Sequence, residues 1–416
     1  MSAARQGFPS VNAQSSKLDQ LFEPRLDKQK ASGLFRELSS RQAPSLASHL
    51  SESSPVLDFA GNDYLGLSQH AKVKKALQEG VAIYGGGATA SHLVSGHHAV
   101  HEEFENKLAG FMGFESATLF SSGYMANLGA VQTLVGSGGN FKKSQWTIFH
   151  DRLNHASLID AVSLSGARSK RYRHQDYQHL ASLLEEDDSP HKLVISDGVF
   201  SMDGDMADLG ELNALCNDAG AILMIDDAHG VGAVGTRGRG VCDWVEPSDL
   251  PGVLVITFGK AFGLAGACVL GPASLKSAMA QFARTYIYTT ATPPAIACGL
   301  LASLELISSE EGQQLREQLN ASIADFSCRA ERAQKRGEIR DKCKSATPIQ
   351  PLIFGSNEKV MNFKEQLQRE NILVGAIRSP TVPKGAERLR VTLNATHSPQ
   401  DIAALFDALE HALKVQ

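Results

Sequence analysis

The chain has 416 residues, of which 43% are hydrophobic and 20% are charged, a composition typical of a soluble globular protein. This length corresponds to roughly two to three domains. The net charge of -5, the pI near 6.3 and the absence of any basic run argue against nucleic acid as the main partner. No stretch approaches the roughly 20 apolar residues that span a bilayer, so we expect no membrane partner.

The six cysteines, at positions 216, 242, 268, 298, 328 and 343, show no CxxC or other metal-ligand spacing. Several lie in apolar runs such as AGACVLG, which indicates reduced thiols in a protein core. The opening residues MSAARQGFPSVNAQSS are polar and lack the apolar segment of a secretory signal. We therefore expect a cytoplasmic protein without a metal site, and a flexible tail at the N-terminus.

Short apolar runs alternate with amphipathic segments along most of the chain. Each run has aliphatic or β-branched residues and ends at Gly, Ser or Asp; the runs lie within residues 117–123, 145–151, 192–201, 221–230, 253–259 and 265–271. This alternation predicts buried strands connected by helices, and hence an α/β fold with a mostly parallel central sheet flanked by helices. In such sheets, ligands bind at the carboxyl ends of the strands.

The pattern changes after residues 290–295, TATPPA. An apolar helix is predicted at 295–307, and a charged helix then continues through Lys335. A smaller α+β unit follows, with strands at 348–355 and 387–395, a helix at 358–371, and a last helix with Ser398 as its N-cap. We predict three parts: an N-terminal tail and helical arm (1–55), a large α/β domain (56–300) and a small C-terminal α+β domain (301–416).

Lys260 stands in the segment ITFGKAFG, directly after the apolar run 253–256. A lysine in a loop is usually solvated. A lysine in a desolvated pocket instead has a lowered pKa and can form a Schiff base with a carbonyl cofactor. A phosphate-binding P-loop is excluded, because Leu254 replaces the first glycine of that motif and Ala261 replaces its Ser or Thr.

Asp226 lies at the end of the apolar run in AILMIDDAHG, and His229 follows three residues later. A buried carboxylate needs a cation beside it. A pyridinium nitrogen is such a cation, and the carboxylate would keep it protonated, as pyridoxal phosphate chemistry requires. Magnesium binding and helix capping are the alternative interpretations of two aspartates after a strand.

Other polar residues also follow predicted strands. The segment SSGYMAN opens a helix, so the backbone amides of Gly123 and Tyr124 could bind a phosphate, with the hydroxyl of Thr257 beside them. The Gly-rich segment 84–98 is an alternative phosphate loop, although a flexible loop or an interface explains its glycines equally well. His155 also follows a strand, in HDRLNHASLID, but a lone histidine is more often structural than catalytic.

Several longer motifs resemble one family. The segments GNDYLGLS, HASLIDA, GVFSMDGDMADL, IDDAHGVG, TFGKAFGLAGA and PTVPKGAERLRVTL occur in this order between about Leu34 and the C-terminus. They resemble the α-oxoamine synthases, which are pyridoxal phosphate enzymes of fold type I. The combination of GVFSMDGD, DDAHG and IRSPTVPKGAERLRVTL is most similar to the branch of this family that acts in biotin biosynthesis.

The resemblance implies a role for each residue that matches the family motifs. Lys260 would form the Schiff base with the cofactor, Asp226 would pair with the pyridine nitrogen, and His155 would stack on the ring. The remaining cofactor contacts would be His229 and Ser201 at the phenolic oxygen, and Gly123, Tyr124, Thr257 and a partner subunit's Thr289 or Thr290 at the phosphate. The substrate contacts would be Arg390 at the amino-acid carboxylate, Asn62 beside it, and Arg36 of the N-terminal helix candidate near the acyl-chain entrance.

The resemblance also implies a homodimer with shared active sites that condenses L-alanine with a pimeloyl thioester of coenzyme A or acyl carrier protein. The alternatives are a sister enzyme, such as 2-amino-3-oxobutyrate CoA ligase or 5-aminolevulinate synthase, and a non-catalytic binding protein of the same fold. Two segments depart from the family pattern. GGATASHLVSG replaces the commoner GSRLVSG type, so Thr89 and His92 receive no role, and Ala291 stands where the biotin branch often has Ser.

Overall fold

The computed structural model describes residues 13–38, 56–136, 142–342 and 345–414. The chain divides into two compact units, Met1–Pro55 and Val56–Gln416. The first unit contains helix α1 (Ala13–Ala31), and the second contains both β-sheets. Helix α1 begins inside the segment predicted as a flexible tail, and residues 1–12 of that tail lie outside the described residues.

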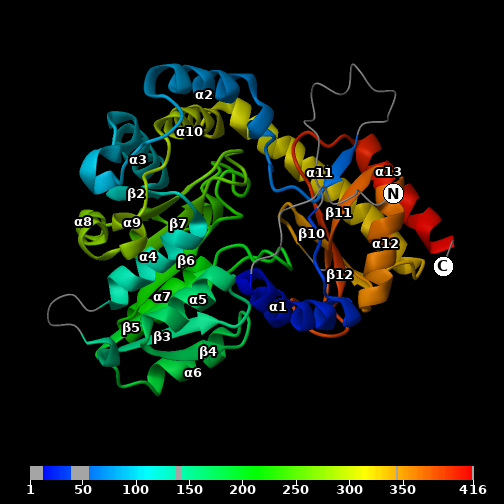
Figure 1. Cartoon of the computed structure of the whole chain (residues 1–416), viewed down its shortest axis with the longest axis horizontal. Helices are drawn as coiled ribbons and strands as arrows, with labels where there is room; N and C mark the ends of the chain where they lie inside the picture. The colour runs from blue at the N-terminus through cyan, green and yellow to red at the C-terminus, as the bar shows by residue number, and fades with distance from the viewer. Residues whose placement is uncertain (1–12, 39–55, 137–141, 343–344, 415–416) are drawn as a thin grey trace. The chain divides into compact units, whose positions relative to one another are not determined.

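The larger sheet has seven strands in the order β2-β8-β7-β6-β5-β3-β4 (Figure 1). Neighbouring strands run parallel except at β8, which is antiparallel to β2 and β7. The strands are β2 (Ser116–Phe120), β3 (Trp146–Asp151), β4 (Arg168–Tyr172), β5 (His191–Asp197), β6 (Ile222–Asp226), β7 (Val253–Thr257) and β8 (Ala267–Gly271). The predicted α/β fold with a mostly parallel sheet is therefore confirmed.

Helices cover both faces of this sheet, because alternate strand residues point to opposite sides. In β7, Val255 belongs to a hydrophobic cluster with residues of α4 and α5, whereas Leu254 belongs to a second cluster with residues of α3 and α7. The helices of this part are α2 (Ala71–Tyr84), α3 (Ala99–Met112), α4 (Gly123–Val135), α5 (Ala156–Ser165), α6 (Tyr177–Glu185), α7 (Leu209–Ala219), α8 (Ala273–Phe282), α9 (Arg284–Ile287) and α10 (Pro294–Ile307). Shorter helical turns are η1 (Leu67–Gln69), η2 (His92–Gly96), η3 (Lys143–Gln145), η4 (Gly240–Trp244) and η5 (Pro247–Asp249).

Strand β4 lies at the edge of the larger sheet, and the sequence does not predict it. Its residues are RSKRY, of which Arg168, Ser169 and Arg171 are exposed and Tyr172 is buried. An edge strand has a single neighbouring strand and remains partly solvated, so it does not need the apolar run that marks a central strand. The apolar pattern therefore detects the interior strands and misses this one.

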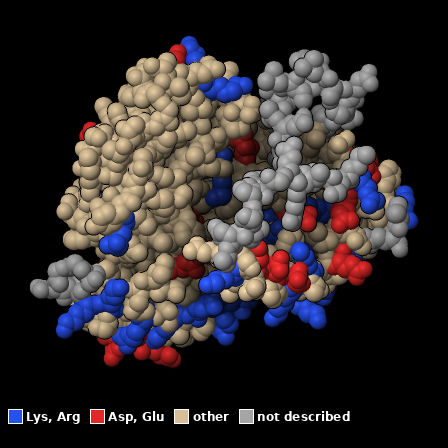
Figure 2. All heavy atoms as spheres, in the orientation of Figure 1, with Lys and Arg blue, Asp and Glu red and all other residues tan. Residues whose placement is uncertain are grey.

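Part of the surface is poor in charge. Figure 2 shows few basic or acidic side chains over α2, α3 and α8 to α10 on the visible face. Several large apolar side chains of these elements, of η2 and directly after α9 are exposed, namely Val81, Ile83, Leu93, Val94, Phe282 and Tyr288. We refer to these six residues as the apolar face. Exposed apolar side chains in a region poor in charge are typical of a protein interface.

The smaller sheet has five strands in the order β1-β11-β12-β10-β9, and all neighbouring pairs are antiparallel except β1 and β11. The elements of this part are β1 (Leu57–Phe59), β9 (Asp341–Lys342), β10 (Ile349–Ile353), β11 (Ile372–Ile377), β12 (Arg388–Thr392), α11 (Glu310–Lys335), α12 (Asn357–Arg369) and α13 (Pro399–Lys414). The backbone N–H of Asp401 donates to Ser398 Oγ at 3.1 Å, which confirms the predicted N-cap. Strand β11 is not predicted, because Gly375 interrupts its apolar run and α12 directly precedes it.

Strand β1 joins the smaller sheet although it lies at the start of the second unit. The range 56–300 predicted for the large domain therefore includes one strand that pairs outside the larger sheet. The domain boundary at residue 300 stays a prediction.

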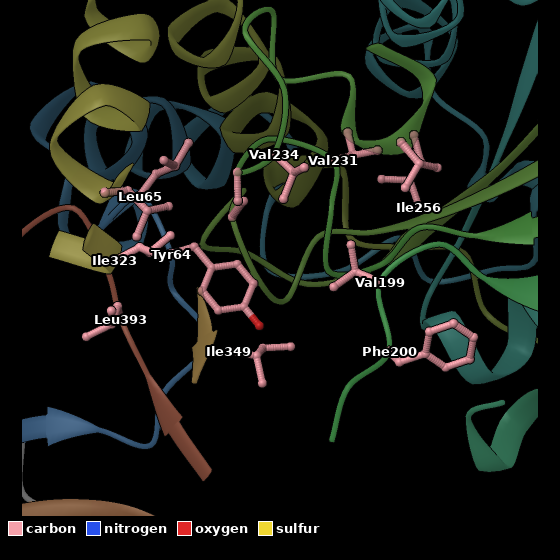
Figure 3. Close-up of a cluster of buried hydrophobic side chains, with 14 of the residues drawn as sticks. Tyr64, Leu65, Val199, Phe200, Val231, Val234, Ile256, Ile323, Ile349 and Leu393 are labelled. Atoms are coloured by element: carbon pink, nitrogen blue, oxygen red, sulfur yellow. The ribbon is translucent and has the colours of Figure 1, made fainter. Parts of the chain in front are cut away.

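One hydrophobic cluster extends from the larger sheet to the smaller one. It includes Ile256 of β7, Ile323 of α11 and Ile349 of β10 (Figure 3). Tyr64 lies in the same cluster and is fully buried. The two sheets of the second unit therefore share one core, and this core fixes the position of residues that lie between them.

In the described part of the chain, no helix has both the length and the apolar character needed to cross a membrane. Among the described cysteines, Cys216, Cys242 and Cys268 are buried free thiols, as predicted, whereas Cys328 is exposed. Cys343 lies outside the described residues.

Candidate active site

Most of the predicted site residues lie at the carboxyl ends of neighbouring parallel strands. Asp226 is the last residue of β6, Thr257 is the last residue of β7, and Lys260 follows β7 directly. His155 follows β3 and begins α5. The right-handed crossovers of a parallel sheet bring these strand ends to one edge, so residues far apart in sequence converge there.

Lys260 has its side-chain amine inside the site. Its Nζ donates to Thr257 Oγ1 at 3.0 Å. Burial lowers the pKa of the Lys260 amine, and the nearby carboxylates of Asp226 and Asp197 only partly oppose that shift. The amine therefore loses its proton more readily than an exposed lysine does, as a nucleophile or base requires.

Asp226 is buried, and both of its carboxylate oxygens accept hydrogen bonds. Asn127 Nδ2 donates to Oδ2 at 2.6 Å, and the backbone N–H of Ala228 donates to Oδ1 at 3.1 Å. Asn127 Nδ2 also contacts Ser157 Oγ at 2.9 Å. Asn127 was not singled out from the sequence, because helix α4 also contains Gln132 and Thr133 and the sequence does not show which polar residue is buried in the site.

His155 is held from its backbone and its ring. Its backbone N–H donates to Asp197 Oδ2 at 2.7 Å, and its Nδ1 contacts Ser157 Oγ at 2.7 Å. The residue itself is exposed. The ring is thus oriented by its neighbours while remaining accessible to a ligand.

Asp197 places a second carboxylate beside Asp226, because the two residues are paired in register on the parallel strands β5 and β6. Burial, together with the charge of Asp226, raises the pKa of the Asp197 carboxyl well above its usual value. Burial also raises the pKa of Asp227 to about 7. The adjacent carboxyl groups of Asp197 and Asp226 make this edge of the sheet favourable for a cation. Asp197 ends a predicted strand but was not among the predicted site residues.

His229 contacts a tyrosine that the sequence analysis did not identify. Tyr64 Oη lies 2.6 Å from His229 Nδ1 and 3.2 Å from Asn62 Oδ1. Burial lowers the pKa of His229 well below its usual value and raises the pKa of Tyr64 to about 12, so both groups are neutral. The contact with Tyr64 orients the imidazole and leaves Nε2 for another partner.

Arg390, on β12 of the smaller sheet, lies close to Asn62 and Ser201. Its Nε donates to the backbone carbonyl of Ser201 at 2.6 Å, and both terminal nitrogens lie 3.3 Å from Asn62 Oδ1. Within the described residues, Arg390 forms no ion pair with a carboxylate, whereas Arg388 on the same strand pairs with Asp203. A buried guanidinium without a protein counter-ion fits an anionic ligand such as a carboxylate.

Gly123 lies against Thr257 at the start of helix α4. A Cβ added at Gly123 would lie 2.5 Å from Thr257 Cγ2, so this approach requires glycine. Ser122 caps the helix through a 3.3 Å contact of its Oγ with the backbone N–H of Met125. Tyr124 is exposed, and its hydroxyl bonds to Asp160. The first backbone amides of α4 are therefore next to Thr257, where a phosphate could bind.

Three predicted site residues are not joined to this group by the contacts found. The backbone carbonyl of Thr290 accepts a hydrogen bond from Ser121 Oγ at 3.4 Å, and Thr289 precedes it. Arg36 belongs to the separate unit of residues 1–55 and lies beyond the end of α1 at Ala31, not inside a helix as predicted. The roles of Arg36, Thr289 and Thr290 stay predictions, as does the contact of the Ser201 hydroxyl with a cofactor.

The combination of groups fits pyridoxal phosphate. Lys260 supplies an amine for its carbonyl, the Asp226 carboxylate suits a protonated ring nitrogen, and the start of α4 at Gly123 suits its phosphate. The adjacent buried carboxyl groups of Asp197 and Asp226 also fit a ligand that brings a positive charge at the ring.

Comparisons with known proteins agree with this chemistry. The sequence pattern described as "Aminotransferase class I and II" matches residues 54–409. The 8-amino-7-oxononanoate synthase of Stutzerimonas stutzeri (strain A1501) is 48% identical over 387 residues, which cover 92% of this chain and 95% of that protein.

Two solved structures are also similar. One is the 8-amino-7-oxononanoate synthase of Francisella tularensis, with a TM-score of 0.71 and 30% identity over 86% of this chain and 98% of that one. The other is a serine palmitoyltransferase in its pyridoxal phosphate internal aldimine form, with a TM-score of 0.83 and 26% identity over 97% of this chain and 99% of that one. The chain therefore belongs to the aminotransferase class I and II family, within its pyridoxal phosphate-dependent α-oxoamine synthases of fold type I.

Proposed function

We propose that the chain is an 8-amino-7-oxononanoate synthase of biotin biosynthesis. It condenses L-alanine with a pimeloyl thioester and gives 8-amino-7-oxononanoate, carbon dioxide and the free thiol. The observation that carries the proposal is the half-buried Lys260 amine, which lies at the same strand ends as the Asp226 and Asp197 carboxylates. The identity of 48% to a synthase over nearly the whole of both chains supports this reaction over its sister reactions.

Bound pyridoxal phosphate supplies a carbonyl that links to an amine and a protonated ring that withdraws electrons from the substrate Cα. We assign Lys260 Nζ to the covalent link with this carbonyl, and to removal and return of the Cα proton as general base and acid. Its lowered pKa supports this role, because a deprotonated amine must be present near neutral pH. Asp226 would hold the proton at the ring nitrogen, and Asn127 fixes the direction of its carboxylate.

The other residues position the substrates. The exposed ring of His155 would stack on the cofactor and would donate a hydrogen bond to the thioester oxygen as negative charge develops there. Arg390 binds the alanine carboxylate with Asn62 beside it, since its guanidinium lacks a protein counter-ion among the described residues. His229 and Ser201 would contact the phenolic oxygen, and Gly123, Tyr124 and Thr257 would hold the phosphate. The family resemblance alone assigns Arg36 to the acyl chain.

A substrate screen tests the proposed reaction. Purified protein with its cofactor is mixed with alanine, glycine or serine, and with pimeloyl or acetyl thioesters of coenzyme A or acyl carrier protein, while thiol release is followed. Alanine with a pimeloyl thioester should give the highest kcat/KM. Faster turnover of glycine with an acetyl thioester would assign a sister activity, and a protein that binds the cofactor without any turnover would be a non-catalytic binding protein.

Replacement of Arg390 by lysine should raise the KM for alanine at least about tenfold, because a point charge replaces a planar group that binds a carboxylate with two hydrogen bonds. The KM for the thioester should change little. The measurement is initial rate against alanine concentration at saturating thioester. Arg388→Lys is the matched control on the same strand, because Arg388 pairs with Asp203 and should leave the alanine KM unchanged. An unchanged alanine KM in Arg390→Lys would place the carboxylate site elsewhere.

We further propose that the protein is a cytoplasmic homodimer with shared active sites. The apolar face supports this, because its six exposed side chains would be covered by a second copy. The segment that follows α9 joins this face, through Tyr288, to Thr289 and Thr290. A neighbouring subunit would then receive one of these threonines at its cofactor phosphate.

A mixing experiment tests whether sites are shared. Lys260→Ala protein and a Thr289→Ala, Thr290→Ala double variant should each have little activity. After subunit exchange in equal amounts, activity should return to roughly a quarter of the wild-type value, because half of the dimers are mixed and each mixed dimer has one complete site. Exchange is verified with differently labelled subunits. No recovery after proven exchange, or a fully active monomer in sedimentation, would contradict shared sites.

A further inference from the structure

Three histidines outside the proposed active site form a compact cluster. His92 and His97 lie at the start and just past the end of the turn η2, and His101 lies in the first turn of α3. Each can offer one ring nitrogen such that the three nitrogens are all within 4.8 Å of one another. The ring centres are 5.1 Å apart for His92 and His97, 5.4 Å for His92 and His101, and 5.5 Å for His97 and His101.

These separations match one face of a tetrahedral metal site. Bonds of about 2.0–2.1 Å from zinc to histidine nitrogens, at tetrahedral angles, place the ligand nitrogens about 3.4 Å apart and the ring centres about 5.2 Å apart. The observed triangle of ring centres has sides of 5.1 to 5.5 Å. The side chains would therefore need only small rotations to bind one ion.

Contacts within the cluster hold the rings close together. His92 and His101 are buried. The Nδ1 atoms of His92 and His97 lie 2.8 Å apart and form a hydrogen bond, in which one of the two nitrogens carries the proton. A metal ion bound to both nitrogens would replace this proton.

Neighbouring groups orient the rings as in known metal sites. His101 Nε2 donates to the backbone carbonyl of Thr292 at 2.8 Å, so its proton is on Nε2 and its lone pair is on Nδ1. This Nδ1 now accepts from the backbone N–H of His98 at 3.1 Å, a contact that a metal ion would replace. A ligating histidine usually donates its second nitrogen to a carbonyl or carboxylate in this manner. The His92 ring is stacked on Tyr286 with ring centres 4.7 Å apart and planes at 11°. His97 is exposed, which leaves a fourth position accessible to water.

We propose that His92, His97 and His101 bind one divalent metal ion that prefers nitrogen ligands, with zinc as the first choice, and that solvent completes the coordination. The absence of a metal site predicted from the cysteine spacing does not extend to these histidines. The ion would tie η2 and α3 to residues 286–292, since Tyr286 and Thr292 both contact the cluster and the Ala291 N–H donates to Ala90 O at 2.9 Å. This inference is independent of the proposed reaction.

Metal binding to the full-length protein with its cofactor tests the proposal. The protein is stripped with a chelator, dialysed, and titrated with Zn²⁺ against a chromophoric competitor, and Co²⁺ is added in parallel to record its visible spectrum. We expect one Zn²⁺ per chain, a Co²⁺ spectrum typical of four-coordination, and a higher melting temperature with Zn²⁺.

Variants of single histidines distinguish this site from others. His97→Ala removes an exposed ligand without opening the core, and it should weaken Zn²⁺ binding at least about tenfold and abolish the four-coordinate Co²⁺ spectrum. His98→Gln is the matched control, because His98 is adjacent and lies outside the cluster of three, and it should bind Zn²⁺ as the wild type does. Failure of the wild-type protein to bind Zn²⁺, or equal binding by wild type and His97→Ala, would overturn the proposal.

Discussion

Replacement of Lys260 by alanine should lower turnover of alanine and the pimeloyl thioester at least about 10⁴-fold, because one amine supplies both the covalent link to the cofactor and the proton transfers. The fold should survive. The only hydrogen bond found for Lys260 Nζ is with Thr257 Oγ1, and the residue makes no ion pair among the described residues. Thiol release measures turnover, and circular dichroism with thermal unfolding measures the fold.

A second variant at position 260 tests whether a positive charge there is enough for turnover without a reactive amine. Lys260→Arg keeps a cation near Asp226 and Asp197, but a guanidinium neither links to the carbonyl nor acts as a base near neutral pH. It should therefore be as inactive as the alanine variant. Borohydride reduction should fix the cofactor covalently to the wild-type protein and to neither variant. Substantial turnover by Lys260→Ala would contradict the assignment of this residue.

The interior of the larger sheet could be predicted because its strands are buried on both faces. A strand such as β7, Val253–Thr257, must then be apolar along its length, and its sequence shows this directly. The same reasoning fails for β4, whose exposed Arg168 and Arg171 are compatible with an edge strand and with a loop. It also fails for β1, because nothing in three residues indicates pairing with β11 more than 300 positions later in the sequence.

Some residues of the candidate site could also be predicted from the sequence, and others could not. Lys260 and Asp226 could be identified because a charged residue directly after an apolar run is unusual and needs an explanation. Asn127 and Tyr64 could not, because their roles come from contacts with Asp226 and His229 that depend on how distant segments pack. The histidine cluster was not predicted from the sequence for another reason. Four residues separate His92 from His97 and three separate His97 from His101, and such spacings occur in zinc sites. Without a cysteine pair or a glutamate in an HExxH motif, these spacings are too unspecific to predict a site, and the turn η2 brings the rings together.

These missed residues share a function in the structure. Asn127 orients the carboxylate of Asp226, and Tyr64 orients the ring of His229. Both are buried, so each can hold its partner in one direction. The residues that would touch the cofactor are thus visible in the sequence pattern, while those that position them become visible only in three dimensions.

Replacement of Asp226 by asparagine should lower turnover roughly 10²- to 10³-fold, because the neutral amide no longer stabilises a proton on the ring nitrogen. Asp226→Glu should lose much less, since it keeps the negative charge. The asparagine variant is a clean electrostatic test. The Asn127 Oδ1 atom has no hydrogen-bond partner among the described residues, so rotation of its amide would present an acceptor to the new NH2 group and to the Ser157 hydroxyl. The backbone N–H of Ala228 could still donate to the remaining oxygen.

The readouts for Asp226 are turnover, the dissociation constant of pyridoxal phosphate and the melting temperature without cofactor. Asp226→Asn should weaken cofactor binding and leave the melting temperature close to that of the wild type. Asp227→Asn is the matched control. Its carboxyl is equally buried, has a pKa raised to about 7, and accepts from the backbone N–H of Val241 at 2.8 Å, which an asparagine oxygen can also do. This variant should keep most of the turnover. Equal losses in Asp226→Asn and Asp226→Glu would show that the geometry of the carboxylate, and not its charge, determines the rate.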